Sequence, residues 1–350
     1  QLGIDHVELR FEFAEIMERV QRVIKTVEPH DSVERYTGLG VDCIQGEARI
    51  LSPYRVEVAG KVITTRNIIV ATGARPSIPA IPNIDAMNPL TSDSLWSIRE
   101  QPKRLLVLGG GPIGCELTQA FQRLGTQVIQ VLRGPRLLPR EDTDIAEYVQ
   151  QKFIDEGVDL RLNHKMLEFL TVEGEKQLRC DVNGEIVDIG FDQLLVATGR
   201  KANVTGFGLE KLAIPLTPDG RIEVNEFLQT RFPNIYACGD VCSPYQFTHS
   251  AAHQAWYAVV NALLAGLKRF KVDYSLIPAA TFTDPELARV GLNEQEAKAQ
   301  GIDYEVTRFD LEELDRAIAD ENASGMVKVL TVPGKDKILG ATIIGPLAGE

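Results

Sequence analysis

A glycine-rich turn within residues 104–116 constrains the fold of this chain more than any other feature. Its first residues are apolar and indicate a buried strand, after which Gly109, Gly111 and Gly114 follow with the spacing G-x-G-x-x-G. In this pattern the first glycine permits a tight turn, the second lets a pyrophosphate approach the backbone, and the third lets a helix pack close to the strand. That helix directs its positive end at the phosphates. The pattern predicts a dinucleotide-binding site, although a tight turn in another α/β protein would contain the same glycines.

Apolar residues on both sides of the turn follow alternating strand and helix periodicities. Around the turn we expect strands at 105–108, 127–132, 159–162 and 193–197, helices at 112–124 and 143–156, and three meander strands at 166–172, 176–182 and 185–189. This alternation is typical of a parallel sheet, here with an inserted antiparallel layer. Elsewhere we expect helices at 8–28 and 250–264 and strands at 41–44, 48–51, 55–58, 61–64, 67–71, 235–238, 280–282, 304–309, 326–331 and 338–344.

Composition and charge exclude several classes of partner. The chain has a net charge of −12 and no tract of lysine or arginine, which argues against nucleic acid or an anionic membrane surface as the main partner. No apolar run approaches the roughly 20 residues that cross a bilayer. Five scattered cysteines fit a reducing compartment better than a disulfide scaffold, so we expect a cytoplasmic protein.

Two close pairs of possible ligands have simpler interpretations. Cys238 and Cys242 indicate either a redox or metal role or, as we favour, small apolar residues at the end of a buried strand. His249 and His253 have a spacing that would place both on one helix face, but no third ligand is evident. We therefore expect no metal site.

Two similar seven-residue strings occur at 68–74 and 194–200, and in each an apolar strand leads into Ala-Thr-Gly. Glycine at such a position permits a sharp turn beside a ligand, and threonine can donate a hydrogen bond there. Because the two copies bracket the nucleotide-binding pattern, they predict one domain inserted into another. The chain would leave the outer domain at Gly73 and return to it at Gly199.

A third apolar strand, expected at 235–238, leads into Gly239 and Asp240. Ligands bind at the carboxyl ends of strands in open parallel sheets, and a carboxylate there can accept hydrogen bonds from sugar or ribityl hydroxyls. The alternative interpretation is that Asp240 caps the helix that follows.

These strings resemble the flavoprotein pyridine nucleotide–disulfide oxidoreductases, especially the mercuric reductase-like members. The resemblance covers nearly the whole chain and rests on the two Ala-Thr-Gly strings and on 109–116, 136–142, 232–241, 282–286, 290–292, 338–341 and 349–350. It implies an α/β fold: a partial FAD-binding domain at 1–90 and 200–270, an inserted Rossmann-like NAD(P)-binding domain at 91–199, and a partial C-terminal α+β dimerisation domain at 274–350. A homodimer is implied for the intact protein.

The resemblance also implies which residues hold FAD and face the nicotinamide. Asp240, after Gly239, would bind the ribityl chain of FAD, and residues 246–249 would place backbone N–H groups beside the flavin pyrimidine. Ile113 and Glu116 would face the nicotinamide, and Glu116 would pair with a lysine upstream of residue 1. The full set implied for the cofactors, besides these and the glycines of the turn, is Gly46, Ala48, Thr72, Gly73, Ser92, Gly199, Gln246, Phe247, Thr248 and His249.

The end of the strand expected at 127–132 bears on the choice between NADPH and NADH. Leu132 stands where NAD-using members of the family carry glutamate, and Arg133, Arg136 and Arg140 follow. Guanidinium groups suit a 2′-phosphate by charge and fork geometry, so NADPH is favoured over NADH. Two alternatives stay open: the arginines are a solvated loop, or Arg140 pairs with the acidic residues at 141, 142 and 144.

The family's redox dithiol, C-x-x-x-x-C, has no counterpart in this sequence. The resemblance places that dithiol, and a first glycine motif for FAD, upstream of residue 1, and a His-Glu acid/base pair beyond residue 350. We therefore expect a fragment, inactive alone, with no catalytic residue of its own, of an enzyme that passes a hydride from NADPH via FAD to a disulfide or a thiol-bound metal ion. The alternatives are a flavin NAD(P)H oxidase or peroxidase, or a catalytically silent nucleotide-binding fragment.

Overall fold

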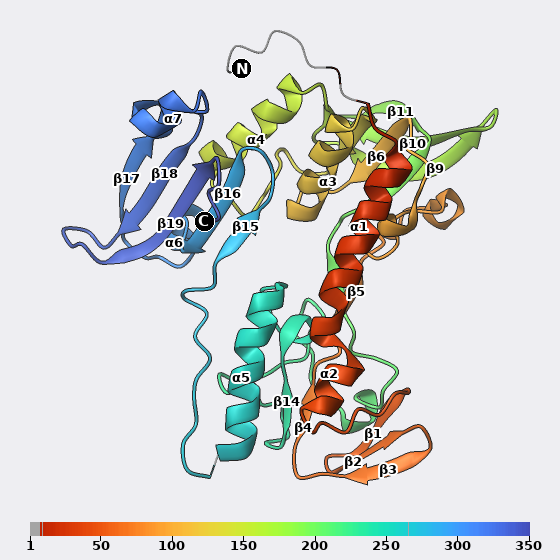
Figure 1. Ribbon diagram of the computed structural model, residues 1–350, viewed down its shortest axis with the longest axis vertical. Coiled ribbons are helices and arrows are strands. Elements are labelled where there is room, and N and C mark those ends of the chain that lie inside the picture. Colours follow the sequence, from red (N-terminus) through yellow and green to blue (C-terminus); the bar gives the residue numbers. More distant parts are fainter. Residues whose placement is uncertain (1–7, 9, 265) are drawn as a thin grey trace. The chain divides into compact units, whose positions relative to one another are not determined.

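The computed structural model describes residue 8, residues 10–264 and residues 266–350 (Figure 1). The described chain divides into two compact units. The first unit contains residues up to Gln21, together with Pro76–Gly199 and Ser275–Glu350, and the second contains Arg22–Arg75 and Arg200–Tyr274. The boundary near the N-terminus falls inside helix α1 (Phe13–Val27). In the described part of the chain, no helix is both long and apolar enough to span a membrane.

A four-stranded parallel sheet forms the centre of the nucleotide-binding part of the first unit. Its strand order is β12-β6-β7-β8, from β6 (Arg104–Leu108), β7 (Gln127–Val131), β8 (Asp159–Arg161) and β12 (Gln193–Val196). Helices α3 (Pro112–Arg123) and α4 (Thr143–Asp155) connect the strands. The four residues 105–108 are fully buried, as a strand covered on both faces requires. The expected alternation of strands and helices is confirmed.

An antiparallel layer follows the second helix, as expected. Strands β9 (Lys165–Val172), β10 (Glu175–Val182) and β11 (Glu185–Phe191) pair in the order β11-β10-β9. Phe169 and Phe191 meet edge to face at 5.8 Å between ring centroids, in a core shared with Leu106 of β6. The layer is thus fixed to the parallel sheet by apolar packing.

The C-terminal part of the first unit is a five-stranded antiparallel sheet of order β15-β16-β19-β18-β17 (Figure 1). Its strands are β15 (Ala279–Thr281), β16 (Glu286–Gly291), β17 (Glu305–Asp310), β18 (Met326–Thr331) and β19 (Ile338–Gly345), with helices α6 (Glu294–Ala299) and α7 (Asp315–Ala319). Leu287, Met326 and Ile344 share one core with Val149 and Phe153 of α4. This sheet is therefore packed directly on the nucleotide-binding part.

The second unit contains two small sheets and a long helix. Strands β1 (Ala48–Ser52), β2 (Arg55–Val58) and β3 (Lys61–Thr64) form an antiparallel sheet, and β4 (Ile68–Val70) pairs in parallel with β14 (Ile235–Ala237). The helices are α2 (Val33–Gly38) and α5 (Thr248–Leu264). Two short strands, β5 (Ala74–Pro76) and β13 (Arg200–Ala202), pair where the chain crosses between the units.

Two sequence predictions need correction. The helix expected at 8–28 begins only at Phe13, and part of its expected start lies outside the described residues. The strand expected at 41–44 is wrong. Its apolar residues Val41 and Ile44 are 49% and 45% exposed, and no described strand pairs with them, so the backbone has no ladder to join.

Candidate functional site

The glycine turn after β6 is enforced by two backbone contacts. Gly109 has φ +110°, and a Cβ there would lie 2.4 Å from the carbonyl oxygen of Ala197. A Cβ on Gly114 would lie 2.6 Å from the carbonyl oxygen of Gly109. Both contacts are with backbone, which cannot swing aside. Gly109 therefore permits the tight turn beside Ala197, and Gly114 lets α3 pack close to that turn, as their spacing predicts.

The second glycine faces open space. Gly111 precedes α3 with an ordinary extended backbone, and a Cβ there would meet no atom within 4 Å. No side chain caps this end of α3, and Pro112, the first residue of the helix, has no N–H. The N–H groups of the first turn and the positive end of the helix therefore lie beside open space at Gly111.

Gln130, which the sequence analysis did not single out, supports the glycine turn through a hydrogen bond. It is fully buried in the middle of β7, and its Nε2 donates to the carbonyl oxygen of Gly109 at 2.9 Å. Its Oε1 is buried without a partner among the described residues. The sequence contains a signal for this role, because a glutamine inside the apolar string Val-Ile-Gln-Val has a buried amide that needs a hydrogen-bond partner.

The three arginines after β7 differ in what they contact. Arg136 is held within the protein: its guanidinium donates to the Thr143 hydroxyl and, at 2.8 Å, to Gln295 Oε1. Arg133 and Arg140 are exposed, and neither guanidinium has a partner among the described residues. The structure thus leaves two of the three predicted phosphate ligands available and gives Arg136 a structural role.

The proposed pairing of Arg140 with its acidic neighbours does not occur in the described part of the chain. Those neighbours have other partners, because Glu141 pairs with Arg289 at 3.0 Å and the next two acidic residues both pair with Lys328. Leu132 is buried beside Gly110, so no carboxylate stands at that position to bind ribose hydroxyls.

One face of α3 grips the segment between β15 and β16. Glu116 accepts a hydrogen bond from the Phe282 N–H at 3.0 Å. Gln119 exchanges two 2.7 Å hydrogen bonds with the backbone of Asp284, and Arg123 forms an ion pair with the Asp284 carboxylate at 2.6 Å. Their i, i+3, i+7 spacing places them on one helix face. The segment at 282–284 is therefore anchored to the nucleotide-binding helix.

Glu116 also has an altered acidity. Burial raises the pKa of its carboxyl above the ordinary value, an effect that the hydrogen bond from Phe282 only partly offsets. Ile113, one turn earlier on α3, is 39% exposed. These two side chains lie on the helix that begins at the glycine turn, where the resemblance expects the nicotinamide.

The two Ala-Thr-Gly strings form matched hydrogen-bond patterns. In the second unit, Thr72 Oγ1 donates to the Asn203 carbonyl at 2.7 Å, and the Asn203 N–H donates to Gly73 at 2.9 Å. In the first unit, Thr198 Oγ1 donates to the Ser77 carbonyl at 2.7 Å, and the Ser77 N–H donates to Gly199 at 2.9 Å. Each threonine thus makes the hydrogen bond that the sequence predicts, and both glycines have positive φ.

Asp240 follows β14 in a short 3-10 turn and does not cap α5. Its Oδ2 pairs with the Arg200 guanidinium at 3.2 Å, while Oδ1 has no hydrogen-bond partner among the described residues. Gly239 has φ +77° and donates its N–H to Gln254 Oε1 at 2.7 Å. One carboxylate oxygen of Asp240 is thus paired with Arg200, and the other is available as an acceptor.

Helix α5 begins at Thr248, inside the stretch expected beside a flavin. The rings of Phe247 and His249 stack at 5.2 Å, and Gln246 is half-buried. Ser250, in the first turn, is fully buried, and its hydroxyl has no partner in the described part of the chain. A buried hydroxyl without a partner fits a polar ligand at this end of α5.

The remaining predicted residues lie in different units. Gly46, with φ +151°, and Ala48 at the start of β1 belong to the second unit with Thr72 and Gly73. Ser92 belongs to the first unit, where its carbonyl accepts a hydrogen bond from the Trp96 ring N–H at 2.6 Å.

The cysteines show no redox pair among the described residues. All five are free thiols, and burial raises the pKa of Cys115 and of Cys242 to about 12. Burial also raises the pKa of Cys238, as expected for a residue at the end of a buried strand. Within the described ranges, no group of three or more His, Cys, Asp or Glu side chains could hold a metal ion.

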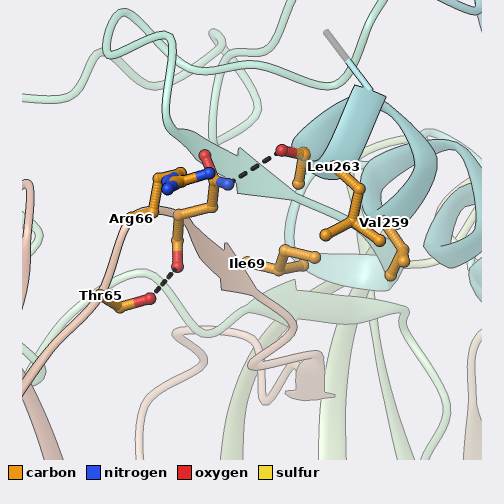
Figure 2. Close-up of a pocket in the computed structure, with 7 residues that line it drawn as sticks. Thr65, Arg66, Ile69, Val259 and Leu263 are labelled. Atoms are coloured by element: carbon orange, nitrogen blue, oxygen red, sulfur yellow. Dashed lines mark hydrogen bonds between the residues drawn. The ribbon is translucent and has the colours of Figure 1, made fainter.

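A surface hollow of about 420 Å³ lies in the second unit, between the start of β4 and the end of α5 (Figure 2). Asn67 in its wall donates to the Ala262 carbonyl at 2.9 Å. Its lining is Thr65, Arg66, Asn67, Ile69, Val259, Ala262 and Leu263. None of these residues was predicted to bind a cofactor, and the lining carries a single charged group, so we assign it no chemistry.

Several proteins of known function are similar to this chain in sequence. Mercuric reductase from Staphylococcus aureus is 36% identical over 320 residues, which are 91% of this chain and 58% of that protein. The mitochondrial dihydrolipoyl dehydrogenase of Sus scrofa is 33% identical over 361 residues, 99% of this chain and 69% of the relative. The chain thus spans little more than half the length of the mercuric reductase.

Solved structures give the same result. The HOCl-induced flavoprotein disulfide reductase RclA from Escherichia coli has a TM-score of 0.84 at 27% identity, covering 97% of this chain and 77% of that one. For LpdA from Mycobacterium tuberculosis the TM-score is 0.86 at 26% identity, covering 100% and 76%.

Two family models together match most of the chain. One, described as pyridine nucleotide-disulphide oxidoreductase, matches residues 6–255. The other, described as the dimerisation domain of the same family, matches residues 277–350. The resemblance drawn from the sequence strings is confirmed, and the chain belongs to the pyridine nucleotide-disulphide oxidoreductase family.

Proposed function

We propose that this chain is the nucleotide-binding and dimerisation part of a flavoprotein reductase that draws electrons from NADPH. The observation that carries the proposal is the open space at Gly111, over the uncapped start of α3. The chemistry that the cofactors supply when bound is the transfer of a hydride from NADPH to FAD and of two electrons onward to a disulfide or a thiol-bound metal ion. The chain's own residues bind and orient these groups.

NADPH would be held at two ends of its adenosine diphosphate moiety. The N–H groups at the start of α3 would bind the pyrophosphate, with Gly109 and Gly114 setting the turn. Arg133 and Arg140 would bind the 2′-phosphate, because both guanidinium groups are exposed and lack partners among the described residues. The buried Leu132 supports NADPH over NADH, since it offers ribose hydroxyls no carboxylate.

FAD would be held by residues of the second unit. The free Oδ1 of Asp240 would accept hydrogen bonds from the ribityl hydroxyls, and the first N–H groups of α5 with the Ser250 hydroxyl would donate to polar atoms of the flavin ring. Gly46, Ala48, Thr72 and Gly73 would line the rest of this part. Ile113 and Glu116 would face the nicotinamide.

The acceptor chemistry would use a cysteine pair supplied from outside these residues. Two of the described thiols, Cys115 and Cys242, have a pKa raised to about 12, which leaves too little thiolate for disulfide exchange. We further propose a homodimer formed through the C-terminal sheet, a reducing cytoplasmic setting, and the domain division at 1–90 with 200–270, 91–199 and 274–350.

Removing the two exposed guanidinium groups tests the cofactor assignment. In the double variant Arg133→Met, Arg140→Met we expect the Kd for NADPH to rise by about 30-fold, since charge-assisted hydrogen bonds to a phosphate are worth roughly 1.5–3 kcal/mol. The Kd for NADH should change by less than about two-fold, because NADH lacks the 2′-phosphate. Both constants are measured by fluorescence titration of the reduced nucleotide.

Lys103→Met is the matched control for this pair. It removes an exposed positive charge just before β6, at the end of that strand opposite the glycine turn, and should leave both constants unchanged. A parent chain that binds NADH as tightly as NADPH, or a double variant with an unchanged ratio of the two constants, would contradict the assignment.

A further inference from the structure

The arginine loop, which we define as residues 133–142, is attached to helix α6 of the C-terminal part. Asn293 Nδ2 donates to the carbonyl oxygen of Arg140 at 2.7 Å. Gln295 bridges two points of the loop, since its Nε2 donates to the Glu141 carbonyl and its Oε1 accepts from Arg136 at 2.8 Å. The α6 segment thus holds the two successive carbonyl groups of Arg140 and Glu141.

The attachment is mutual, because the loop also supplies a cap for α6. The carboxylate of Asp142 accepts hydrogen bonds from the N–H groups of Glu294 at 3.2 Å and Gln295 at 3.1 Å. Asn293 is itself the N-cap residue of α6, where its Oδ1 accepts from the Glu296 N–H at 2.9 Å. One amide side chain therefore caps α6 with its oxygen and fastens the arginine loop with its nitrogen.

A buried lysine also joins the end of the arginine loop to the C-terminal sheet. Lys328 of β18 is fully buried, and its Nζ lies 3.1 Å from Asp142, 2.7 Å from Asp144 and 3.0 Å from Glu294. Burial alone would lower the pKa of Lys328, but hydrogen bonds to the carboxylates outweigh it and raise that pKa. The end of the arginine loop, the start of α4 and the start of α6 thus share one charged centre.

This arrangement fixes the backbone of Arg140 while its guanidinium stays exposed. An arginine on a mobile loop must become ordered when it binds a phosphate, and this ordering lowers the affinity. An arginine on a loop that is already ordered avoids that loss. The carbonyl of Arg140 is held directly by Asn293, and the Glu141 carbonyl that follows it is held by Gln295. The backbone of Arg140 is therefore ordered by the C-terminal part before any nucleotide arrives.

We propose that α6, through Asn293 and Gln295, is a positioning element for 2′-phosphate recognition, so that the dimerisation part of the chain sets the preference for NADPH. The inference rests on the proposed function, because it assumes that Arg140 binds the 2′-phosphate. It assigns Asn293 and Gln295 no contact with the nucleotide; they act through the backbone of the arginine loop.

The variant Asn293→Ser separates the two roles of that side chain. Serine is a good N-cap residue and keeps the acceptor for Glu296, but it is too short to donate to Arg140. We expect the Kd for NADPH to rise about five-fold, as for the loss of one positioning hydrogen bond, with the Kd for NADH changed by less than about two-fold. Gln300→Ser, at the exposed end of α6, is the matched control and should leave both constants unchanged.

The ratio of the two constants is the deciding readout, because general damage to the fold would weaken both nucleotides alike. An unchanged ratio, or an equal rise in both constants, overturns the inference. Should Asn293→Ser fail to fold, Gln295→Met decides by the same ratio, since it removes the bridge to Glu141 and Arg136 and keeps the cap. If Arg140→Met alone leaves the ratio of the parent unchanged, the proposed function fails; if it changes the ratio and the α6 variants do not, only the inference fails.

Discussion

Gly114→Ala is expected to destabilise the chain by about 3 kcal/mol or more. The added Cβ would lie 2.6 Å from the carbonyl oxygen of Gly109, a backbone atom held by the fully buried Gln130. Relief would require α3 to move away from the sheet, and α3 shares its core with the C-terminal sheet through Cys115. The free energy of unfolding, from urea denaturation monitored by circular dichroism, measures the loss.

Gly111→Ala is the matched substitution in the same turn. Its Cβ meets no atom within 4 Å and its φ of −78° is ordinary for alanine, so stability should stay within about 1 kcal/mol of the parent. Equal stability of the two alanine variants would show that the contact between α3 and the turn is not tight, and would contradict the geometry on which the site is built.

Lys328→Met is expected to cost about 3–5 kcal/mol at pH 7, the typical cost of breaking a buried ion pair from one side. The methionine fills a similar volume but leaves the carboxylates of Asp142, Asp144 and Glu294 together without their cation. Lys335→Met, an exposed lysine in the turn after β18, is the control and should change stability by less than about 0.5 kcal/mol.

The pH dependence of this loss has a definite sign. Burial raises the pKa of Glu294, but hydrogen bonds from Lys328 and Tyr304 outweigh it, so the folded pKa is lowered. Glu294 therefore stabilises the parent above its unfolded pKa, and that contribution is lost as the pH falls through the folded pKa. Without Lys328, Glu294 keeps its burial and loses the cation that stabilises its charge, so the difference in stability between parent and variant should shrink between pH 7 and about pH 4. A gap that widens on acidification would contradict this account.

Structural features that depend on a few consecutive residues could be predicted from the sequence. The turn at Gly109 and Gly114 and the positive-φ glycines of the two Ala-Thr-Gly strings follow from local backbone rules, although the partners of Thr72 and Thr198 lie 131 and 121 positions away. The strands around them are marked by apolar runs. For these features, the residue types and their spacing contain the physical cause.

Contacts between distant segments could not be predicted in the same way. The role of Arg136 depends on Gln295, which lies 159 positions further along the chain, and nothing near either residue indicates the pair. Asp240 likewise pairs with Arg200, 40 residues earlier. A long polar side chain has several partners within reach, and the tertiary fold decides which of them it meets.

The most direct test of the account is a fluorescence titration of the parent chain and of Gly111→Ala with NADPH. The central claim is that a pyrophosphate lies against the backbone at Gly111, in the space that a Cβ would occupy. We expect saturable binding to the parent, and at least a roughly 100-fold weaker affinity for the alanine variant at near-parental stability. Absence of binding to the parent, or equal affinity for both chains, would contradict the claim.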